Sequence, residues 1–466
     1  MALFSLQPNG DVSLVDQITK KIIELIDRQI LRPGSKLSSI RKSANELGVS
    51  TFTIIEAYNR LTALRYLQSR PGSGFYVAAL KPRSINLPAA LSERAFDYIW
   101  LIRGQLQDTP GKINVSTGKL PRDWGDQELV RRGLKILASK ADSTLNSYGE
   151  PYGYLPLRQL LQVKLSEIGI RADQDQIVLT QGATQALELI VRSLLKPGDS
   201  VLVDDPGYFN LFGNLQLHGI RLLPVPRTPD GPDVTVVEQL AVEHRPKVFF
   251  TQSLLHNPTG TNLSPHIAFR LLQLASQMGF KIVENDCYAD LMPGQATRLT
   301  ALDQLNQVIY VSTFSKTVST SVRVGFLACG KELAENIVNI KMLSSITSAQ
   351  LNERLVYHVL TEGHYRHHLE RLRGLLSGGI ARTVEVLEKF GFEIFSSPVG
   401  GKFVWVRHPD FPDSTELSRL AAEDDIILAP GSVFRPDLVA TSWLRLNVAY
   451  GDHPALHAFL HKVTKR

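Results

Sequence analysis

The sequence predicts a chain of two unequal parts: a small basic helical module, followed by a much larger α/β domain with a mostly parallel sheet. Three observations support this prediction. The chain has 466 residues, whereas a single domain rarely exceeds about 250–300 residues. Its excess positive charge lies entirely in the first 83 residues. From about residue 114 onward, short apolar runs alternate with helical stretches, a pattern typical of helices packed on a parallel sheet.

The net charge of +6 is confined to one end of the chain. Residues 1–83 contain twelve Lys and Arg against six Asp and Glu, whereas the remaining 383 residues contain 39 of each sign. This asymmetry indicates a polyanion-binding module joined to a domain that has no electrostatic reason to bind polyanions.

Several other classes of protein are excluded by composition. Two cysteines, Cys287 and Cys329, allow neither a disulfide framework nor a cysteine-based zinc site, and they fit a reducing cytosol. No apolar run approaches the ~18–20 residues of a membrane span, and the N-terminus lacks the features of a signal peptide. His364, His367 and His368 fit a solvated helix better than a metal site. We therefore expect a soluble, cytoplasmic protein with no metal and no membrane partner.

The basic module is predicted to hold three helices and a hairpin. Apolar residues recur every four positions in the first segment, which predicts an amphipathic helix. Pro33-Gly34 ends that helix, and Gly48-Val49-Ser50 makes a turn in which Ser50 is an N-cap. The predicted helices are Leu14–Leu31, Ser39–Leu47 and Thr51–Tyr66, and the predicted hairpin is Arg65–Val77.

This order of elements is the outline of a winged helix-turn-helix. The third helix of such a module enters the major groove of DNA. Arg70 and the small residues at the hairpin tip, Gly72, Ser73 and Gly74, are positioned to approach phosphates or the minor groove. A packing or dimerisation appendage with a solvated charged face is the alternative that the pattern leaves open.

The motifs PGSKLSSIR, LGVS, EAYNRL and RPGSGFYV occur in the order and spacing of the DNA-binding domain of the GntR regulators, which residues 10–79 resemble. Thr51 and Ile55 stand where the family commonly has basic or polar residues, and Arg65 replaces its glycine. Phosphate contacts are therefore favoured over base readout. The resemblance implies that double-stranded DNA is contacted by Ser39, Arg41, Ser50, Thr51, Thr53, Arg70, Gly72, Ser73 and Gly74.

Residues 80–112 are predicted to link the two parts. They mix prolines with an apolar patch that contains Phe96, Tyr98 and Trp100. A flexible linker and a linker that packs these rings on a neighbouring domain both fit this composition.

The larger part, residues 113–466, is predicted to be an α/β domain. Its helices include Thr184–Leu195 and Pro265–Met278. In such sheets, ligands bind beyond the carboxyl ends of the strands. The predicted strands are Ile177–Thr180, Ser200–Val203, Val248–Thr251, Lys281–Glu284, Val308–Val311 and Val324–Cys329.

Chemically suitable residues follow five of these strands. They are Thr180–Thr184, Asp205–Tyr208, Asn257–Gly260, Asp286–Tyr288, and Ser312–Lys316 with Arg323 beyond it. A lysine forms a Schiff base with an aldehyde cofactor, and an aspartate keeps a pyridine nitrogen protonated, which makes the ring an electron sink. A Gly/Thr turn at a helix N-terminus binds phosphate through its free N–H groups.

From about Ser147 to the C-terminus the chain resembles the fold-type I aminotransferases. The resemblance implies a large domain with a mostly parallel sheet, a smaller C-terminal α+β subdomain, and pyridoxal 5'-phosphate bound as a Schiff base. Its catalytic residues would be Lys316, which forms the Schiff base, and Asp286, which pairs with the ring nitrogen. The other implied contacts are Tyr148, Gly182, Ala183, Thr184, Thr313, Ser315 and Arg323 for the phosphate (Tyr148 in the partner subunit's site), Tyr208 for stacking, Asn257 and Tyr288 for the ring 3-oxygen, and Arg445 for a substrate α-carboxylate.

A GntR head fused to this domain in this order resembles the MocR type of bacterial regulator. That resemblance implies a head-to-tail homodimer that binds promoter DNA and senses an amino acid or amine as an external aldimine with the cofactor. A working aminotransferase that carries a DNA-binding head is the rival interpretation. A structural platform without cofactor is a third, and it leaves Lys316 and Asp286 unexplained. The sequence does not identify the effector or the target genes.

Overall fold

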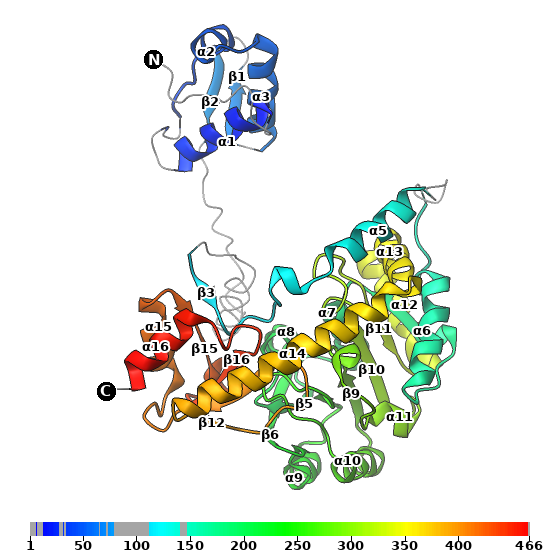
Figure 1. Ribbon diagram of the computed structural model, residues 1–466. Coiled ribbons are helices and arrows are strands. Elements are labelled where there is room, and N and C mark those ends of the chain that lie inside the picture. The colour runs from blue at the N-terminus through cyan, green and yellow to red at the C-terminus, as the bar shows by residue number, and fades with distance from the viewer. Residues whose placement is uncertain are drawn as a thin grey trace. The chain divides into compact units, whose positions relative to one another are not determined.

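The computed structural model describes residues 6, 13–27, 31, 34–64, 66–70, 73–78, 111–139 and 147–464. The chain divides into two compact units, Met1–Pro88 and Ala89–Arg466 (Figure 1). The predicted linker lies outside the described residues except for Gly111 and Lys112, and its apolar patch lies outside them entirely.

The first unit, the head, is a three-helix module closed by a hairpin. α1 (Leu14–Asp27) and α3 (Thr51–Ala63) bury their apolar faces against each other, with α2 (Ile40–Leu47) beside α3. Strands β1 (Leu67–Arg70) and β2 (Gly74–Val77) pair antiparallel. The apolar stripe that predicted the first helix lies in the core, since the isoleucines of the stripe that the structure describes are at most 5% exposed: Ile18, Ile22 and Ile26.

Two helix bounds of the head differ from the prediction. α3 ends at Ala63 rather than at Tyr66, because the N–H of Leu64 closes the last turn on the carbonyl of Arg60 at 2.9 Å and the chain then enters β1. α2 begins at Ile40 because Ser39 is its N-cap. α1 is described as far as Asp27, and residues 28–30 lie outside the described part.

The second unit, the large domain, is built on a central sheet. Within the described residues eight strands lie in the order β4-β11-β10-β9-β8-β5-β6-β7. The five strands from β10 to β6 run parallel, whereas β11 and β7 are antiparallel to their neighbours. The bounds are β4 Ile177–Thr180, β5 Ser200–Asp205, β6 Arg221–Thr228, β7 Gly231–Pro232, β8 Val248–Thr251, β9 Lys281–Asn285, β10 Val308–Thr313 and β11 Gly325–Ala328.

Helices cover both faces of this sheet. One face packs against α7 (Ala183–Leu194), α8 (Phe209–Leu217) and α12 (Lys331–Ser345). The other face is covered by helices of two further clusters, and α9 and α10 lie side by side there (Figure 1). These are α5 (Gln127–Ser139), α6 (Leu155–Glu167), α9 (Val234–His244), α10 (Pro265–Met278), α11 (Leu299–Asp303) and α13 (Gln350–Thr361).

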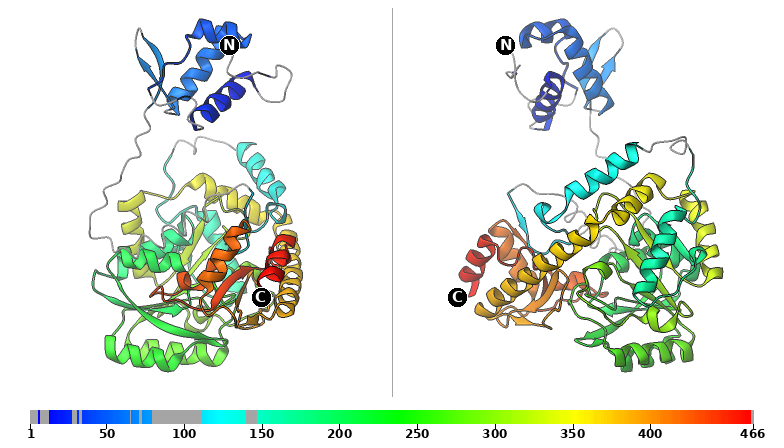
Figure 2. Two further views of the ribbon diagram at one scale, coloured as in Figure 1. Left: turned by 90° about the vertical axis from the view of Figure 1, so that its left-hand side faces the viewer. Right: turned by 45° about the vertical axis from the view of Figure 1, so that its right-hand side comes forward.

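A smaller C-terminal subdomain follows the long helix α14 (His364–Lys389), which runs from the large sheet to the subdomain (Figures 1 and 2). Its sheet has the order β12-β13-β16-β15, and β3 pairs with β14 in a separate parallel ribbon. This arrangement confirms the predicted α+β subdomain. The bounds are β3 Ile113–Asn114, β12 Glu393–Ile394, β13 Phe403–Arg407, α15 Ser414–Glu423, β14 Ile426–Ile427, β15 Ala429–Pro430, β16 Trp443–Asn447 and α16 Pro454–Thr464.

The predicted elements of the large domain agree closely with the structure, with small shifts at their ends. β5 and β10 run two residues further than predicted, and β9 one residue further, so Asp205 and Thr313 are the last residues of strands rather than loop residues. α7 begins at Ala183, one residue early. In the described part of the chain, no helix is long and apolar enough to cross a membrane.

Candidate functional site

The carboxyl ends of five strands meet at one edge of the large sheet. β4, β5, β8, β9 and β10 all point the same way, because β4 and β10 are both antiparallel to β11. The residues that follow these strands therefore gather at that edge, as the strand-end pattern predicted. They include Gly182, Tyr208, Asn257, Asp286 and Lys316.

Asp286 is fully buried directly after β9. Its Oδ2 accepts hydrogen bonds from Arg298 Nε at 2.7 Å and from the Tyr310 hydroxyl at 3.0 Å. Its Oδ1 is buried and has no partner among the described residues. A carboxylate held on one oxygen and free on the other suits the protonated nitrogen of a pyridine ring. Sequence reasoning missed Arg298 and Tyr310, which lie 12 and 24 residues from Asp286.

Lys316 lies in the segment after β10 and lines a cavity of about 780 Å³. Burial lowers the pKa of its amine, and the nearby guanidinium groups of Arg445 and Arg323 lower it further. A lysine whose charged form is disfavoured is a better nucleophile toward an aldehyde.

The N-terminus of α7 and the guanidinium of Arg323 form a cradle for an anion. Arg323 donates to Ser315 Oγ at 3.2 Å and to the Gln181 carbonyl at 3.1 Å. Gly182 has a φ of +81°, and a Cβ there would come within 2.8 Å of that guanidinium, so the close approach requires glycine.

Further predicted phosphate residues lie in the same cradle. Ala183 and Thr184 open α7, and Thr184 is exposed. Thr313 donates to Ser315 Oγ at 3.1 Å. Free helix N–H groups, hydroxyls and one guanidinium together fit a phosphate.

Arg445 on β16 is 1% exposed. It donates to Asn257 Oδ1 at 2.7 Å and to the carbonyl of Ser116, while its Nε has no partner in the described residues. Burial lowers its pKa to about 10, so it stays charged at neutral pH. A fixed guanidinium of this kind suits a carboxylate.

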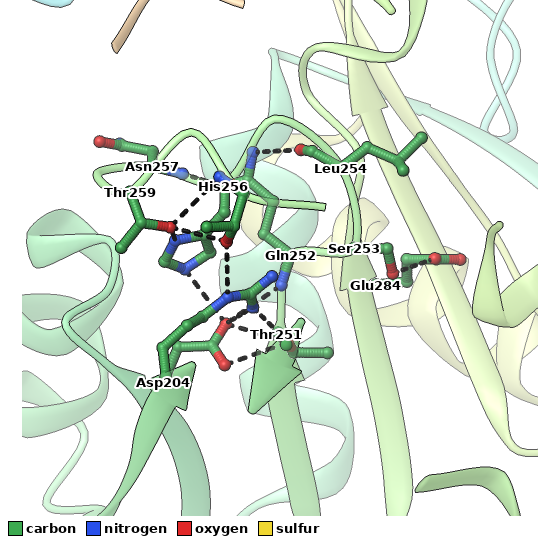
Figure 3. Close-up of polar contacts among 12 residues, drawn as sticks. Asp204, Thr251, Gln252, Ser253, Leu254, His256, Asn257, Thr259 and Glu284 are labelled. Carbon is green, nitrogen blue, oxygen red and sulfur yellow. Dashed lines mark hydrogen bonds and ion pairs between the residues drawn. The ribbon is translucent and has the colours of Figure 1, made fainter. Parts of the chain in front are cut away.

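A buried polar network holds the loop that carries Asn257 (Figure 3). Asp204 at the end of β5 accepts from Arg227 at 3.1 Å, from the Thr251 hydroxyl at 2.9 Å and from the Gln252 backbone N–H at 3.2 Å. The side-chain oxygen of Gln252 then accepts from the Asn257 backbone N–H at 3.2 Å. No sequence motif predicted this network.

Three tyrosines were predicted to contact the cofactor. Tyr288 is 6% exposed, and its ring contacts Phe403 at 6.2 Å between centroids. Tyr208 is half-buried after β5, where its hydroxyl accepts from Asn210 at 3.3 Å. Tyr148 is 80% exposed in the single chain, so the structure does not bring it into the cluster of strand-end residues within one subunit.

The predicted DNA-binding residues of the head fall into two groups. Ser39 and Ser50 cap α2 and α3, and the hydroxyls of Ser50 and Thr53 bond to each other at 2.8 Å. Arg41 and Thr51 are exposed at the first turns of these helices. Sequence reasoning missed Phe52, which is 71% exposed on α3 beside Thr51. Near the start of α3 the exposed face is therefore neutral.

The positive charge of the hairpin is organised around a tyrosine. The guanidinium of Arg70 lies 4.4 Å from the centroid of the Tyr76 ring, and the amine of Lys36 lies 5.8 Å from it. Ser73 Oγ bonds to the Tyr76 hydroxyl at 2.6 Å. Gly74 has a φ of +105°, and Gly72 lies outside the described residues. Lys36 was not among the predicted residues.

Each of the two units matches a known protein family. Residues 110–463 match the aminotransferase class I and II family, and residues 14–77 match the bacterial regulatory proteins of the gntR family. The chain is 28% identical over 448 residues to the HTH-type transcriptional regulator YdcR of Escherichia coli, covering 93% of this chain and 94% of YdcR. It is 31% identical over 362 residues to the 2-aminoadipate transaminase of Thermus thermophilus, covering 76% of this chain and 89% of that enzyme.

Solved structures also resemble the large domain. The kynurenine aminotransferase of Pyrococcus horikoshii superposes with a TM-score of 0.74 at 26% identity, covering 82% of this chain and 96% of that chain. The α-aminoadipate aminotransferase LysN of Thermus thermophilus superposes with a TM-score of 0.71 at 27% identity, covering 80% and 96%.

A DNA-reading head on a domain of aminotransferase fold defines a regulator built from an enzyme scaffold. The chain belongs to the aminotransferase class I and II family, and its GntR-type head makes it a transcriptional regulator of the MocR type.

Proposed function

We propose that this regulator binds pyridoxal 5'-phosphate at the strand ends of its large domain and uses it to sense an amino acid or amine. The observation that carries this proposal is the buried Oδ1 of Asp286, which has no partner among the described residues and lies in the strand-end cluster that also contains Lys316. The relatives whose structures contain the cofactor or its adducts, such as LysN, have the same fold. When bound, the cofactor supplies an aldehyde and an electron-sink ring.

Each residue of the site then has a defined part. Asp286 holds the proton on the ring nitrogen, and Arg298 and Tyr310 fix its other oxygen. Arg323, with the first turn of α7, binds the phosphate. Asn257 and Tyr288 orient the ring 3-oxygen. Lys316 supplies the amine that attaches the cofactor to the chain.

Arg445 is proposed to bind the α-carboxylate of an amino-acid effector, because it is buried, charged and held by Asn257. The cofactor's aldehyde would accept either the Lys316 amine or an effector amine, and displacement of Lys316 would change the charge and contacts at the edge of the large sheet. A ligand shifts a conformational equilibrium only when it binds the two states with different affinity, and this displacement provides such a difference.

A homodimer, arranged head-to-tail, is proposed to pass this change to the DNA-binding heads in the cytoplasm. The 80% exposure of Tyr148 supports a dimer. Tyr148 is expected to bind the cofactor phosphate, and a side chain that is exposed in its own subunit can do so in the site of a partner subunit. Two heads also imply paired half-sites in the operator.

The test of cofactor binding is the absorption band of the lysine-attached cofactor. We expect the full chain to acquire this band on addition of pyridoxal 5'-phosphate, and Lys316→Ala to lack it. Lys331→Ala is the matched control, because this exposed lysine lies on α12 and pairs with Asp173 at 3.0 Å. An identical spectrum from Lys316→Ala would contradict the proposal.

The rival function is that of a working aminotransferase, because one relative of the chain is a transaminase. Turnover of a panel of amino acids with a keto acid acceptor, measured beside operator binding, separates the two. We expect the effector to change DNA affinity while transamination stays slow, at well under ~1 s⁻¹, against the 1–10³ s⁻¹ typical of enzymes. Fast turnover without any effect on DNA affinity would favour the enzyme.

A further inference from the structure

A second buried cation lies beside the strand-end site, and neither the predicted mechanism nor the proposed function uses it. Lys402 immediately precedes β13 and is 2% exposed. It lines the same cavity as Lys316. A lysine is almost never fully buried unless it is paired, yet no carboxylate of the described residues forms an ion pair with Lys402.

The backbone at Lys402 is held rigidly. Gly401 has a φ of +79°, and a Cβ there would lie 3.2 Å from Cβ of Leu255. A Cβ on Gly400 would lie 2.8 Å from Cδ of Pro293. On the other side, the carbonyl of Lys402 accepts from the Val448 N–H at 2.9 Å. The side chain therefore leaves a backbone that has little freedom to move.

Lys402 and Arg445 are fastened to the same short loop. Lys402 Nζ donates to the carbonyl of Gly118, and Arg445 donates to the carbonyl of Ser116. Asn447 holds that loop by donating to the carbonyls of Thr117 at 2.9 Å and Lys119 at 2.8 Å. Because the loop is fixed to β16, both cations are fixed with it.

The two cations also share an aromatic ring. Lys402 Nζ and Arg445 Cζ lie 5.3 Å and 4.1 Å from the centroid of the Phe403 ring. Lys402 Nζ is also 5.1 Å from the centroid of the Tyr288 ring. Two basic groups beside one ring suit a ligand that carries two negative groups a few bonds apart.

Lys402 keeps donor capacity for such a ligand. An ammonium has three N–H donors, and among the described residues only the carbonyl of Gly118 accepts one of them. Burial holds the pKa of Lys402 well below its usual range, and the charges of Lys316 and Arg445 lower it further. An anion at this position would remove that penalty.

Basic side chains outnumber acidic ones in the lining of the cavity. Apart from histidines and a tyrosine, its ionisable lining residues are five basic side chains, Lys112, Lys119, Arg122, Lys316 and Lys402, and one carboxylate, Asp126. The Asp126 carboxylate accepts from the Leu129 N–H at 3.0 Å at the start of α5. A low-dielectric cavity lined by one sign of charge concentrates ligands of the opposite sign.

We propose that Lys402 binds the side-chain anion of the effector, so that the regulator recognises an amino acid with a second acidic group. This inference rests on the proposed function, because the amino group and α-carboxylate of the effector occupy the positions assigned to the cofactor and Arg445. Lys402 is then the residue that distinguishes an acidic amino acid from its neutral amide.

The test compares isosteric ligand pairs on the full-length, cofactor-loaded chain. L-glutamate is titrated against L-glutamine, and L-aspartate against L-asparagine, with the cofactor absorption band and calorimetry as readouts. In at least one pair, we expect the acid to bind tenfold or more tightly than the amide. Lys402→Met, which keeps side-chain length without charge, should lower that ratio to about 1, mainly by weakening binding of the acid. Lys402→Arg should restore part of the preference.

The outcomes separate this inference from the function on which it rests. If no amino acid or amine alters the cofactor band of the unmodified chain, the proposed function fails, and this inference fails with it. If neutral amino acids bind as tightly as acidic ones, or if Lys402→Met keeps the preference, sensing stands and the role of Lys402 is overturned.

A measurement on the unmodified chain guards against a variant that does not fold. Glutarate has two carboxylates and no amine, and its monoamide differs from it by one charge. Calorimetry should find glutarate at least tenfold tighter than the monoamide. Equal binding of the two would overturn the proposal without the use of any variant.

Discussion

The ion pairs in the described part of the head are all exposed, whereas the large domain also contains buried ones. In the head, the ion pair between Arg60 and Asp16 has side chains 54% and 44% exposed. The two cations around Tyr76, Arg70 on β1 and Lys36 before α2, are exposed as well. In the large domain, the side chains of Arg227 and Asp204 are 0% and 5% exposed. Exposed charges contribute little to stability and are screened by salt. Burying a charge costs desolvation free energy, and buried charges often position functional groups.

The largest expected effect follows from breaking the buried pair. Arg227→Met removes the guanidinium partner of the buried Asp204 carboxylate, and we expect the free energy of unfolding of the large domain to fall by about 3–5 kcal/mol. Urea unfolding monitored by tryptophan fluorescence reports on this domain, because Trp405 is 3% exposed within it.

The matched control is Asp16→Asn, which removes the exposed pair of the head and should leave that transition unchanged. Replacing both partners, with Arg227→Met and Asp204→Leu together, should recover part of the loss. Equal effects from Arg227→Met and Asp16→Asn would remove the contrast between the two units.

A second prediction concerns the residue beside Asp204. Burial raises the pKa of Asp205 to about 6, although Arg435 at 3.1 Å partly offsets this shift. The folded state therefore binds the proton more tightly than the unfolded chain, whose pKa is about 4. Stability from this group is full below about pH 4 and is lost as the pH rises through 6.

Asp205→Asn removes this titration. The unfolding free energy of the original chain should rise relative to that of Asp205→Asn as the pH falls from 7 to 4, by up to about 3 kcal/mol. Urea titrations of both proteins across this range measure the difference. A constant difference would show that Asp205 keeps its ordinary pKa in the fold.

Elements whose ends are fixed by local signals are predicted well from the sequence. α10 has its predicted bounds because local signals fix both ends: Ser264 caps it, Pro265 opens it, and Gly279 adopts a φ of +74° after it. The strand-end residues are predictable as well, because a parallel sheet brings them to one edge regardless of their separation in sequence.

Buried partners are harder to predict, because burial depends on contacts between distant segments. Lys402 is not singled out by any sequence motif, and its acceptor is the carbonyl of Gly118, 284 residues away. The pairing of Arg298 with Asp286 depends on how the segment before α11 returns to the sheet. The two glycines that precede Lys402, Gly400 and Gly401, were the available signal, since they indicate a tightly packed turn.

A third prediction tests whether the head depends on buried polar contacts at all. The Tyr58 hydroxyl is buried, and it bonds to Ser43 Oγ at 2.8 Å and to the Ser38 carbonyl at 3.3 Å, joining α2 to α3. Tyr58→Phe should lower the opening free energy of α3 amides in hydrogen exchange by about 1–2 kcal/mol. Tyr76→Phe removes an exposed hydroxyl contact and should leave these amides unchanged.

The smallest expected effect is on DNA binding, where the exposed charges of the head should act one at a time. Arg70 lies over the Tyr76 ring at the hairpin and has no carboxylate partner in the described residues. Arg70→Ala should weaken binding evenly across DNA sequences, and it should lower the slope of log affinity against log salt by about 1. Lys21→Ala is the control, because this exposed lysine on α1 pairs with Glu24 at 3.0 Å.

If Arg70→Ala instead changed which DNA sequence is preferred and left the salt slope intact, the hairpin would read bases rather than phosphates. Sequence recognition would then lie at the hairpin, since the exposed start of α3 presents Thr51 and Phe52 rather than arginines. The exposed charges of the head would in that case select the DNA sequence as well as bind its phosphates, while the buried charges of the large domain bind the effector.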